Sequence, residues 1–283
     1  MKIIVFSKYL AFMVGGAEKS MFELLKRENQ NNIELLSFNN INAFSAQDKK
    51  HQFPEEWKLS FINPFFSFKR FFYLEYLLNR RKIYEYFQLV DDRSILYSYS
   101  IYAPIAINSF AGKTKFFIRS ETDLAINPNY YSGLRRLTKW IYVFVEYPAF
   151  FIYKRDLKKA IEKSEVISNS NFMSKKLMEL YNKKSSVLYP FIDEERLKND
   201  FSKFGNIIKN KGVVFIGDSP IKGLEIAKEI ASLMPTTNFY FFSRFINSSK
   251  KINNITWMAW EKNEVDVYKY AKVVIVPSIC EEG

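Results

Sequence analysis

Two side chains that serve many enzymes are almost missing from this chain of 283 residues, which has one cysteine, Cys280, and one histidine, His51. The single cysteine excludes an intrachain disulfide and a cysteine-rich zinc site, and the single histidine excludes every metal motif that needs two. His51 follows a polar stretch, residues 47–50, and fits a solvated loop better than a Ser-His-Asp triad. Cys280 has no histidine or basic neighbour to favour its thiolate, so we interpret it as a small apolar filler.

Several nucleotide-binding and targeting signals are also missing. The chain has no GxxxxGK[ST] run, which argues against a P-loop NTPase, and no GxGxxG, which argues against a nicotinamide-dependent enzyme. No DxD motif for a metal-bound nucleotide is evident, and Asp91-Asp92 fits a surface turn. Residues 1–7 lack the layout of a signal peptide, so we expect a cytoplasmic protein.

The composition describes a globular and strongly basic chain. Apolar residues make up 48%, enough for a sizeable core, and the length suits two domains. Lys and Arg number 42 against 30 Asp and Glu, a formal net charge of +12. Such a chain attracts phosphates of nucleic acids, nucleotides or anionic lipids. No nucleic-acid motif is present, and the apolar runs are too continuous for a base-stacking platform, so we expect no nucleic acid as partner.

Apolar runs alternate with helical patterns along the whole chain. A strand at residues 2–7, a Gly15-Gly16 loop, a helix at 17–27 and a strand at 33–38 predict a βαβ start and a parallel sheet. Further strands are predicted at 59–62, 95–100, 115–120, 165–168, 213–216, 238–242, 255–258 and 272–276. Further helices are predicted at 65–89, 103–110, 133–163 with a kink or break at Pro148, 172–181 capped by Ser170 or Asn171, 223–233 and 265–270.

A break after Tyr189-Pro190 separates two α/β series. The interpretation is an N-terminal domain at 1–195, a linker at 196–210 and a C-terminal domain at 211–283. The second series is short and ends just after its last strand, which looks buried, so we expect that domain to be incomplete. The chain is then either a fragment or a short gene product.

Three loops that follow strands could carry chemistry, because ligands of open α/β sheets bind at the carboxyl ends of the strands. Gly15-Gly16 before Glu18 lets a backbone approach a phosphate or a sugar hydroxyl, or is simply a tight turn. Gly217 to Gly223 contains Lys222, which suits a diphosphate leaving group or is a solvated lysine. Ser278 to Gly283 carries Glu281 and Glu282, which suit sugar hydroxyls or are a frayed acidic end.

The ordered set of these motifs resembles the retaining GT-B glycosyltransferases of the glycosyl transferases group 1 family, also called family 4. The motifs that carry this resemblance are, in chain order, Gly15-Gly16-Ala17-Glu18, Val166 to Phe172, Val187 to Asp193, Val214 to Gly217 with Lys222-Gly223, Ala271 to Ser278, and Glu281-Glu282-Gly283. They fall in family order and at roughly family spacing over nearly the whole chain.

The resemblance implies two Rossmann-like domains with parallel sheets that face a cleft, the acceptor on the first and the nucleotide sugar on the second. It implies that Lys222 contacts the donor diphosphate, with Gly15, Gly16, Gly217, Gly223 and Ser278 also on the donor. Glu282, or as second choice Glu281, would be the first glutamate of the Glu-x7-Glu motif and contact the transferred sugar. Transfer would retain the anomeric configuration without a cofactor or a metal, and the donor phosphate would help to deprotonate the acceptor hydroxyl.

Three departures from the family pattern bear on the site. The second glutamate of Glu-x7-Glu lies beyond Gly283, and Asp218 replaces a basic residue often found after the strand glycine. The acceptor-side histidine of relatives has no counterpart, and Arg119, Glu121 and Asp123 occupy its region. Those three residues, with Glu18, are candidate acceptor-side residues, and an ordinary polar turn is an equal alternative for the three.

Positive charge and aromatic residues gather at residues 135–163, which hold eight basic and three acidic side chains around an apolar run at 140–153. That run is shorter than the roughly 20 residues that span a membrane. Most of its side chains suit a buried helix, and we expect a minority to face an anionic bilayer, together with residues of 65–89. The sequence thus favours a cytoplasmic, peripheral membrane enzyme of surface polysaccharide or glycolipid biosynthesis that uses a nucleotide sugar and a lipid-linked acceptor. The alternative is a truncated, non-catalytic GT-B-like remnant that binds glycan, lipid or a partner protein.

Overall fold

A computed structural model of the chain describes residues 1–12, 16–27, 32–39, 53–66, 71–119, 136–191, 194–202, 212–217, 222–243, 246–260 and 264–278. The chain divides near residue 192 into two compact units, which we call unit 1 and unit 2 in sequence order. Each has its own sheet and its own hydrophobic core.

Unit 1 is built on a seven-stranded sheet of order β3-β2-β1-β4-β5-β6-β7, in which every neighbouring pair is parallel. This confirms the parallel sheet predicted from the strand–loop–helix–strand order. The strand order reverses between β1 and β4. In open α/β sheets the ligand-binding crevice lies at such a reversal, so we expect it here at the carboxyl ends of β1 and β4. The strands are β1 (Ile3–Phe6), β2 (Ile33–Phe38), β3 (Lys58–Ile62), β4 (Ile95–Ser98), β5 (Lys113–Ile118), β6 (Glu165–Ser168) and β7 (Ser186–Val187).

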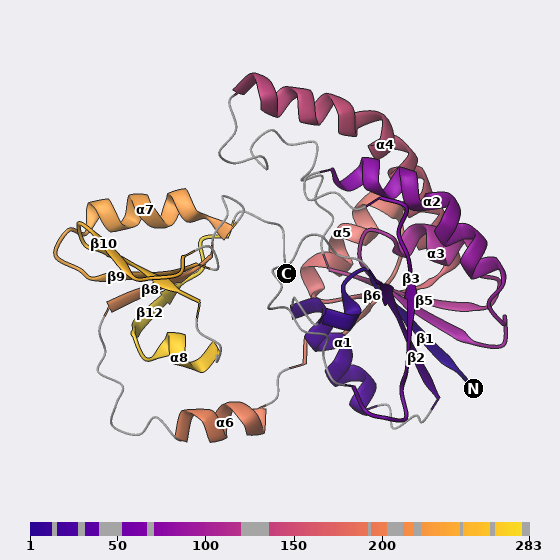
Figure 1. Cartoon of the computed structure of the whole chain (residues 1–283), viewed down its shortest axis with the longest axis horizontal. Coiled ribbons are helices and arrows are strands. Elements are labelled where there is room, and N and C mark those ends of the chain that lie inside the picture. Colours follow the sequence, from indigo (N-terminus) through magenta and orange to yellow (C-terminus); the bar gives the residue numbers. More distant parts are fainter. Residues whose placement is uncertain are drawn as a thin grey trace. The chain divides into compact units, whose positions relative to one another are not determined.

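Helices cover both faces of this sheet because its central strands are apolar on both sides. Ile4 and Phe6 of β1 join the core under α2 (Phe72–Gln88), α3 (Ala103–Ser109), α4 (Arg136–Lys163) and α5 (Asn171–Tyr181), and Figure 1 shows the first three of these helices together on one face. Ile3 and Val5 point to the other face, where they pack with Met21 and Leu25 of α1 (Gly16–Arg27). A short 3-10 helix, η1 (Leu10–Phe12), lies between β1 and α1 in sequence.

Two helices of unit 1 differ from their predicted form. Helix α2 begins at Phe72, seven residues later than expected, because the Asn79 side chain accepts hydrogen bonds from the backbone N–H groups of Phe65 (2.6 Å) and Phe66 (3.2 Å) and holds them outside the helix. Helix α4 continues through Pro148, so of the predicted kink or break the break does not occur. Ser170 rather than Asn171 caps α5, since its hydroxyl accepts from the Met173 N–H at 3.2 Å.

Unit 2 has a five-stranded sheet of order β10-β11-β9-β8-β12, parallel except for β10. Helix α7 packs its Ala227 and Ala231 on one face, and α8 packs Val267 on the other. The elements are α6 (Glu194–Ser202), β8 (Gly212–Ile216), α7 (Leu224–Leu233), β9 (Phe239–Ser243), β10 (Lys250–Ile252), β11 (Ile255–Ala259), α8 (Glu264–Tyr268) and β12 (Ala271–Ile275). The sequence did not predict α6, which lies partly in the expected linker, or β10.

The burial of β12 differs from expectation. The run of Val273, Val274 and Ile275 looked like a buried strand, but β12 is an edge strand of the described sheet and Val273 is 51% exposed. The apolar run correctly predicts a strand. How much of that strand is buried depends on its position in the sheet, where β12 pairs with β8 alone among the described strands.

Candidate functional site

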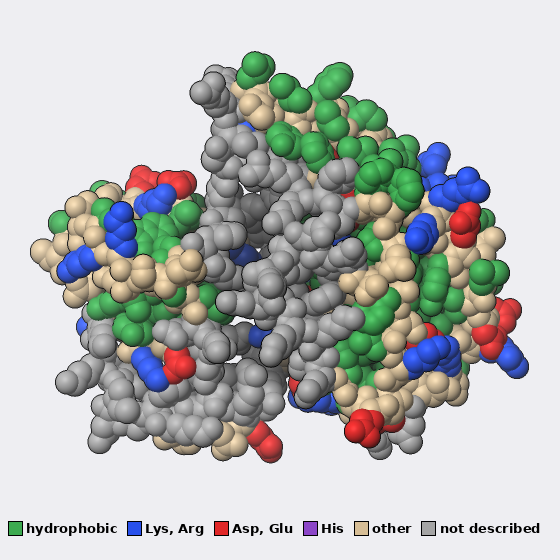
Figure 2. Space-filling model, in the orientation of Figure 1, with side chains coloured by type: hydrophobic (Ala, Val, Ile, Leu, Met, Phe, Trp, Pro, Cys, Tyr) green, Lys and Arg blue, Asp and Glu red, His purple; other side chains and the backbone are tan. Residues whose placement is uncertain are grey.

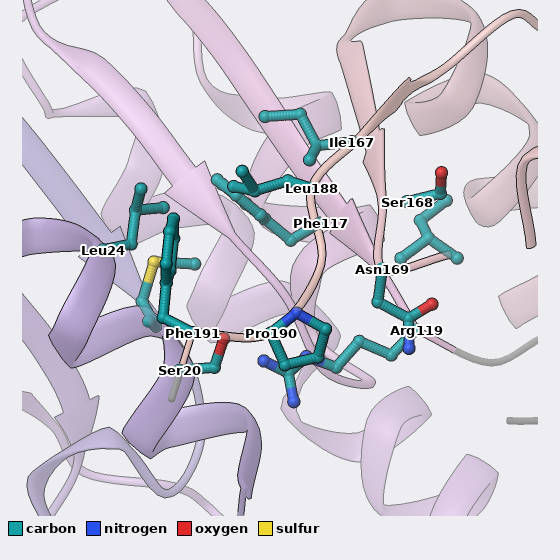
Figure 3. Close-up of a pocket in the computed structure, with 12 residues that line it drawn as sticks. Ser20, Leu24, Phe117, Arg119, Ile167, Ser168, Asn169, Leu188, Pro190 and Phe191 are labelled. Carbon is teal, nitrogen blue, oxygen red and sulfur yellow. The ribbon is translucent and has the colours of Figure 1, made fainter. Parts of the chain in front are cut away.

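A pocket in unit 1 lies where three neighbouring strands end. The last residues of β5 and β6, together with residues that follow β5, β6 and β7, form one side of it, and α1 forms the other (Figure 3). It holds about 340 Å³ of empty space, part of it open to solvent. Its lining residues are Ser20, Met21, Leu24, Phe117, Ile118, Arg119, Ile167, Ser168, Asn169, Leu188, Pro190 and Phe191.

Arg119 is the one charged residue of that lining, and it joins two elements of unit 1. It follows β5, and its side chain extends toward α1, where Nη2 donates to the Ala17 carbonyl at 3.1 Å (Figure 3). A guanidinium held at the pocket wall suits a ligand with hydroxyl, phosphate or carboxylate oxygens. The polar groups of Ser20 and Asn169 lie on the same lining.

Glu18 and Tyr99 lie close to Arg119. Glu18 is buried in the first turn of α1, which starts at Gly16, and open space surrounds the Gly16 α-carbon. Burial raises the pKa of Tyr99, and the negative charge of Glu18 raises it further, whereas the Ser7 hydroxyl and the positive charge of Arg119 lower it. The structure therefore brings Glu18 and Arg119, both candidate acceptor-side residues, to one corner of unit 1.

The carboxyl end of β1 is filled by a buried ion pair. Lys8 follows β1 and pairs with Glu75 of α2, and both side chains are almost inaccessible to solvent. Tyr102 donates to Glu75 Oε1 at 2.7 Å, and the Asn79 amide lies 3.4 Å from the Tyr102 hydroxyl. Because every partner is buried and satisfied by another, we assign this network to the architecture of the crevice rather than to a substrate.

Unit 2 brings its predicted donor residues together at the ends of β8 and β12. Gly217 directly follows β8, and a Cβ there would lie 2.9 Å from the Cβ of Lys222, so the lysine stem runs over the glycine. Gly223 caps α7 with a left-handed φ of 79°, and a Cβ there would lie 1.9 Å from the Pro277 carbonyl oxygen. Ser278 follows Pro277, so Gly223 and the residues just after β12 meet at the N-terminus of α7, next to the exposed Lys222.

This arrangement suits a phosphate group. Glycines leave the backbone accessible, the first N–H groups of α7 point out of the helix, and Lys222 supplies positive charge. Among the described residues, no group of three or more His, Cys, Asp or Glu side chains could hold a metal ion.

Some predicted site residues lie outside the described residues: Gly15, Glu121, Asp123, Glu281 and Glu282, as do Asp218, His51 and Cys280. Sequence reasoning did not assign Ser20, Asn169 or Phe191 to a site, although they line the pocket. Asn169 could have been found, because it follows a predicted strand as Arg119 does. Ser20 and Phe191 gave no such signal.

The two units have the GT-B fold of glycosyltransferases, an α/β fold with two Rossmann-like units. No protein-family model and no curated protein matches the sequence. HepE of Anabaena in complex with UDP-glucose is 15% identical with a TM-score of 0.59, over 100% of this chain and 75% of its own. UGT89C1 of Arabidopsis thaliana with UDP-L-rhamnose is 12% identical with a TM-score of 0.56, over 96% of this chain and 73% of its own. A variant of Os79 of O. sativa with UDP is 10% identical with a TM-score of 0.54, over 97% of this chain and 76% of its own.

Proposed function

We propose that this protein is a glycosyltransferase that moves a sugar from a nucleotide-sugar donor to an acceptor hydroxyl. The observation that carries the proposal is the convergence of Gly217, Lys222, Gly223 and Ser278 at one edge of unit 2. Support comes from structures of the same fold that were solved in complex with UDP, UDP-glucose and UDP-L-rhamnose.

In the proposed reaction the bond between the sugar C1 and the diphosphate breaks, and a bond from C1 to the acceptor oxygen forms. Lys222 and the α7 N-terminus stabilise the negative charge that grows on the departing diphosphate. A donor phosphate oxygen takes the acceptor proton. Glu282, with Glu281 as second choice, contacts the transferred sugar, and the anomeric configuration is retained. Because Lys222 supplies the positive charge, we propose transfer without a metal or a cofactor.

We place the acceptor on unit 1, in the pocket of Arg119. Glu18, Glu121 and Asp123 are the other proposed acceptor-side residues, and Gly15 and Gly16 are proposed to contact the donor. The acceptor chemistry is a glycan hydroxyl on a lipid-linked carrier, which fits a peripheral enzyme on the inner face of a membrane. Surface polysaccharide or glycolipid biosynthesis would be its setting. No helix among the described residues is long and apolar enough to cross a membrane.

The test is a panel of nucleotide sugars with lipid-linked glycan acceptors, followed by release of the nucleoside diphosphate. We expect acceptor-dependent release with at least one donor, and NMR of the product should show the anomeric configuration of that donor. Lys222→Ala should lower the rate strongly. Binding of glycan or lipid with no release from any donor would favour the non-catalytic alternative.

A further inference from the structure

The outward face of α4 is apolar along its first four turns. The exposed positions recur at helical spacing, and from residue 137 to 151 none of them is charged. Phe144 is 81% exposed and Leu137 76%. We define the α4 apolar surface by these exposed side chains: Leu137, Trp140, Ile141, Phe144, Val145, Tyr147 and Phe151.

The same face changes character in the second half of the helix. Continued at helical spacing, the exposed positions become Arg155, Lys158 and Lys159, followed by Glu162 near the end of the helix. At 1.5 Å per residue, Arg155 lies roughly 16 Å along the helix axis from Phe144. An apolar stretch is thus followed on one helix face by a cluster of positive charge.

The neighbouring start of α2 extends the apolar surface. Glu146 on the inner face of α4 accepts hydrogen bonds from the backbone N–H groups of Tyr73 (2.5 Å) and Leu74 (3.2 Å), which ties the first turn of α2 to α4. Phe71 stacks on Tyr142 with ring centroids 4.8 Å apart, and Phe72 is exposed beside them. Figure 2 shows hydrophobic side chains gathered along α4 and onward toward α2.

We propose that this surface docks unit 1 on an anionic lipid bilayer, with the α4 apolar surface at the acyl boundary and Arg155, Lys158 and Lys159 at the headgroups. Trp and Tyr side chains favour the membrane interface, and basic residues near a surface are attracted by anionic lipids. A contiguous exposed apolar patch marks an interaction site. Charge complementarity favours an anionic bilayer over an uncharged partner, because the basic side chains of Arg155, Lys158 and Lys159 follow the apolar surface on the same face of α4. The inference rests on the proposed function, because a lipid-linked acceptor is what would require docking.

The test is co-sedimentation of the full chain with phosphatidylcholine vesicles that contain or lack phosphatidylglycerol. We expect binding to the anionic vesicles. A Trp140→Gln/Phe144→Gln/Phe151→Gln variant should bind about a hundredfold more weakly, because three exposed rings no longer leave water. Lys158→Glu/Lys159→Glu should lose about fivefold or more per lysine, and added salt should reduce that difference. The matched control, Leu89→Gln/Leu233→Gln, removes exposed leucines elsewhere and should bind as the parent does.

Three results would overturn the inference: no binding of the parent to either vesicle, undiminished binding of the triple variant, or a parent that is dimeric without lipid while the triple variant is monomeric. The last would assign the surface to a second copy of the chain. UDP titration separates this inference from the proposed function, since the triple variant should still bind UDP. The parent protein could bind lipid through α4 and yet release no nucleoside diphosphate from any donor. That result would contradict the proposed glycosyltransferase activity but support the docking surface.

Discussion

The carboxyl edges of the two sheets differ in whether side chains or backbone atoms form them. In unit 1 that edge consists of side chains: the Lys8–Glu75 pair fills the end of β1, and Arg119 bridges from β5 to α1. In unit 2 it consists largely of backbone, with Gly217 under the Lys222 stem and Gly223 against the Pro277 carbonyl.

This difference fits the two recognition tasks of the proposed function. Backbone N–H groups and one cation suffice for a diphosphate, whose charged oxygens are common to all nucleoside diphosphate sugars. An acceptor is recognised by its own shape, which requires side chains that can vary. The comparison therefore predicts that unit 1 is sensitive to side-chain changes and unit 2 to an added Cβ.

The largest effect should come from breaking the ion pair of unit 1. Glu75→Leu leaves the Lys8 ammonium buried without its partner, and we expect a loss of about 3–5 kcal/mol in the free energy of unfolding. Urea unfolding followed by tryptophan fluorescence measures it. Lys8→Met/Glu75→Leu removes both charges and should recover most of the loss, and a double variant as unstable as the single one would show that the charges are not the cause.

An added Cβ at Gly223 should have the next largest effect. Gly223→Ala places a methyl group 1.9 Å from the Pro277 oxygen at a φ of 79°, which costs about 3 kcal/mol or more unless the loop moves. We expect a lower midpoint of thermal unfolding and weaker UDP binding. Gly16→Ala is the matched control in unit 1, where nothing lies within 4 Å of the added Cβ, and it should leave stability within about 0.5 kcal/mol. If Gly223→Ala and Gly16→Ala changed stability equally, the proposed difference between the carboxyl edges of the two sheets would be wrong.

Glu146 makes the stability of unit 1 depend on pH. Burial raises the pKa of its carboxyl from 4.5 to about 7, Glu75 adds to the rise, and hydrogen bonds from the α2 backbone oppose it. Because the folded carboxyl holds its proton more tightly than the unfolded one, its contribution is present below pH 4.5 and is lost as pH rises through 7. Glu146→Gln should abolish a decline on the order of 2 kcal/mol across this window, measured by urea unfolding. A parent and variant with parallel pH profiles would contradict the assignment.

The smallest effect concerns the acceptor side alone. Arg119→Ala removes the guanidinium from the pocket and should raise the KM for acceptor about tenfold while UDP affinity stays unchanged. Initial rates at saturating donor measure the first quantity, and UDP titration the second. A change in UDP affinity without a change in acceptor KM would reverse the roles of the two edges.

The sequence predicted most of the helices and strands, but it was less successful for features that depend on tertiary contacts, such as where a helix begins and how much of a strand is buried. Period and turn residues located β1, α1 and α5 within a residue or two, because these patterns are local. The late start of α2 depends on the Asn79 side chain, and the exposure of β12 depends on its place at a sheet edge. Neither of these features is encoded in a local pattern.

The site was predictable to a similar extent. The glycines and Lys222 stood out because loops after parallel strands share an edge, and the structure places them together. Phe191 lies within the Val187 to Asp193 motif, but its place in the pocket depends on the long-range pairing of β7 with β6, which the motif does not reveal. Most side chains of the apolar run of α4 were expected to be buried and a minority to face a bilayer, because an apolar helix of a large domain is usually covered. More of them are exposed than expected, among them Trp140, Phe144 and Phe151.

The most direct test is calorimetric titration of UDP into the full chain, the Lys222→Ala variant and the Lys228→Ala variant. Lys228 is a half-buried lysine of α7, paired with Glu225 and six residues after Lys222, and serves as the control. We predict that the parent binds UDP, that Lys222→Ala weakens binding about tenfold or more, and that Lys228→Ala does not. No binding by the parent, or equal affinity in all three proteins, would contradict a nucleotide-sugar site on unit 2.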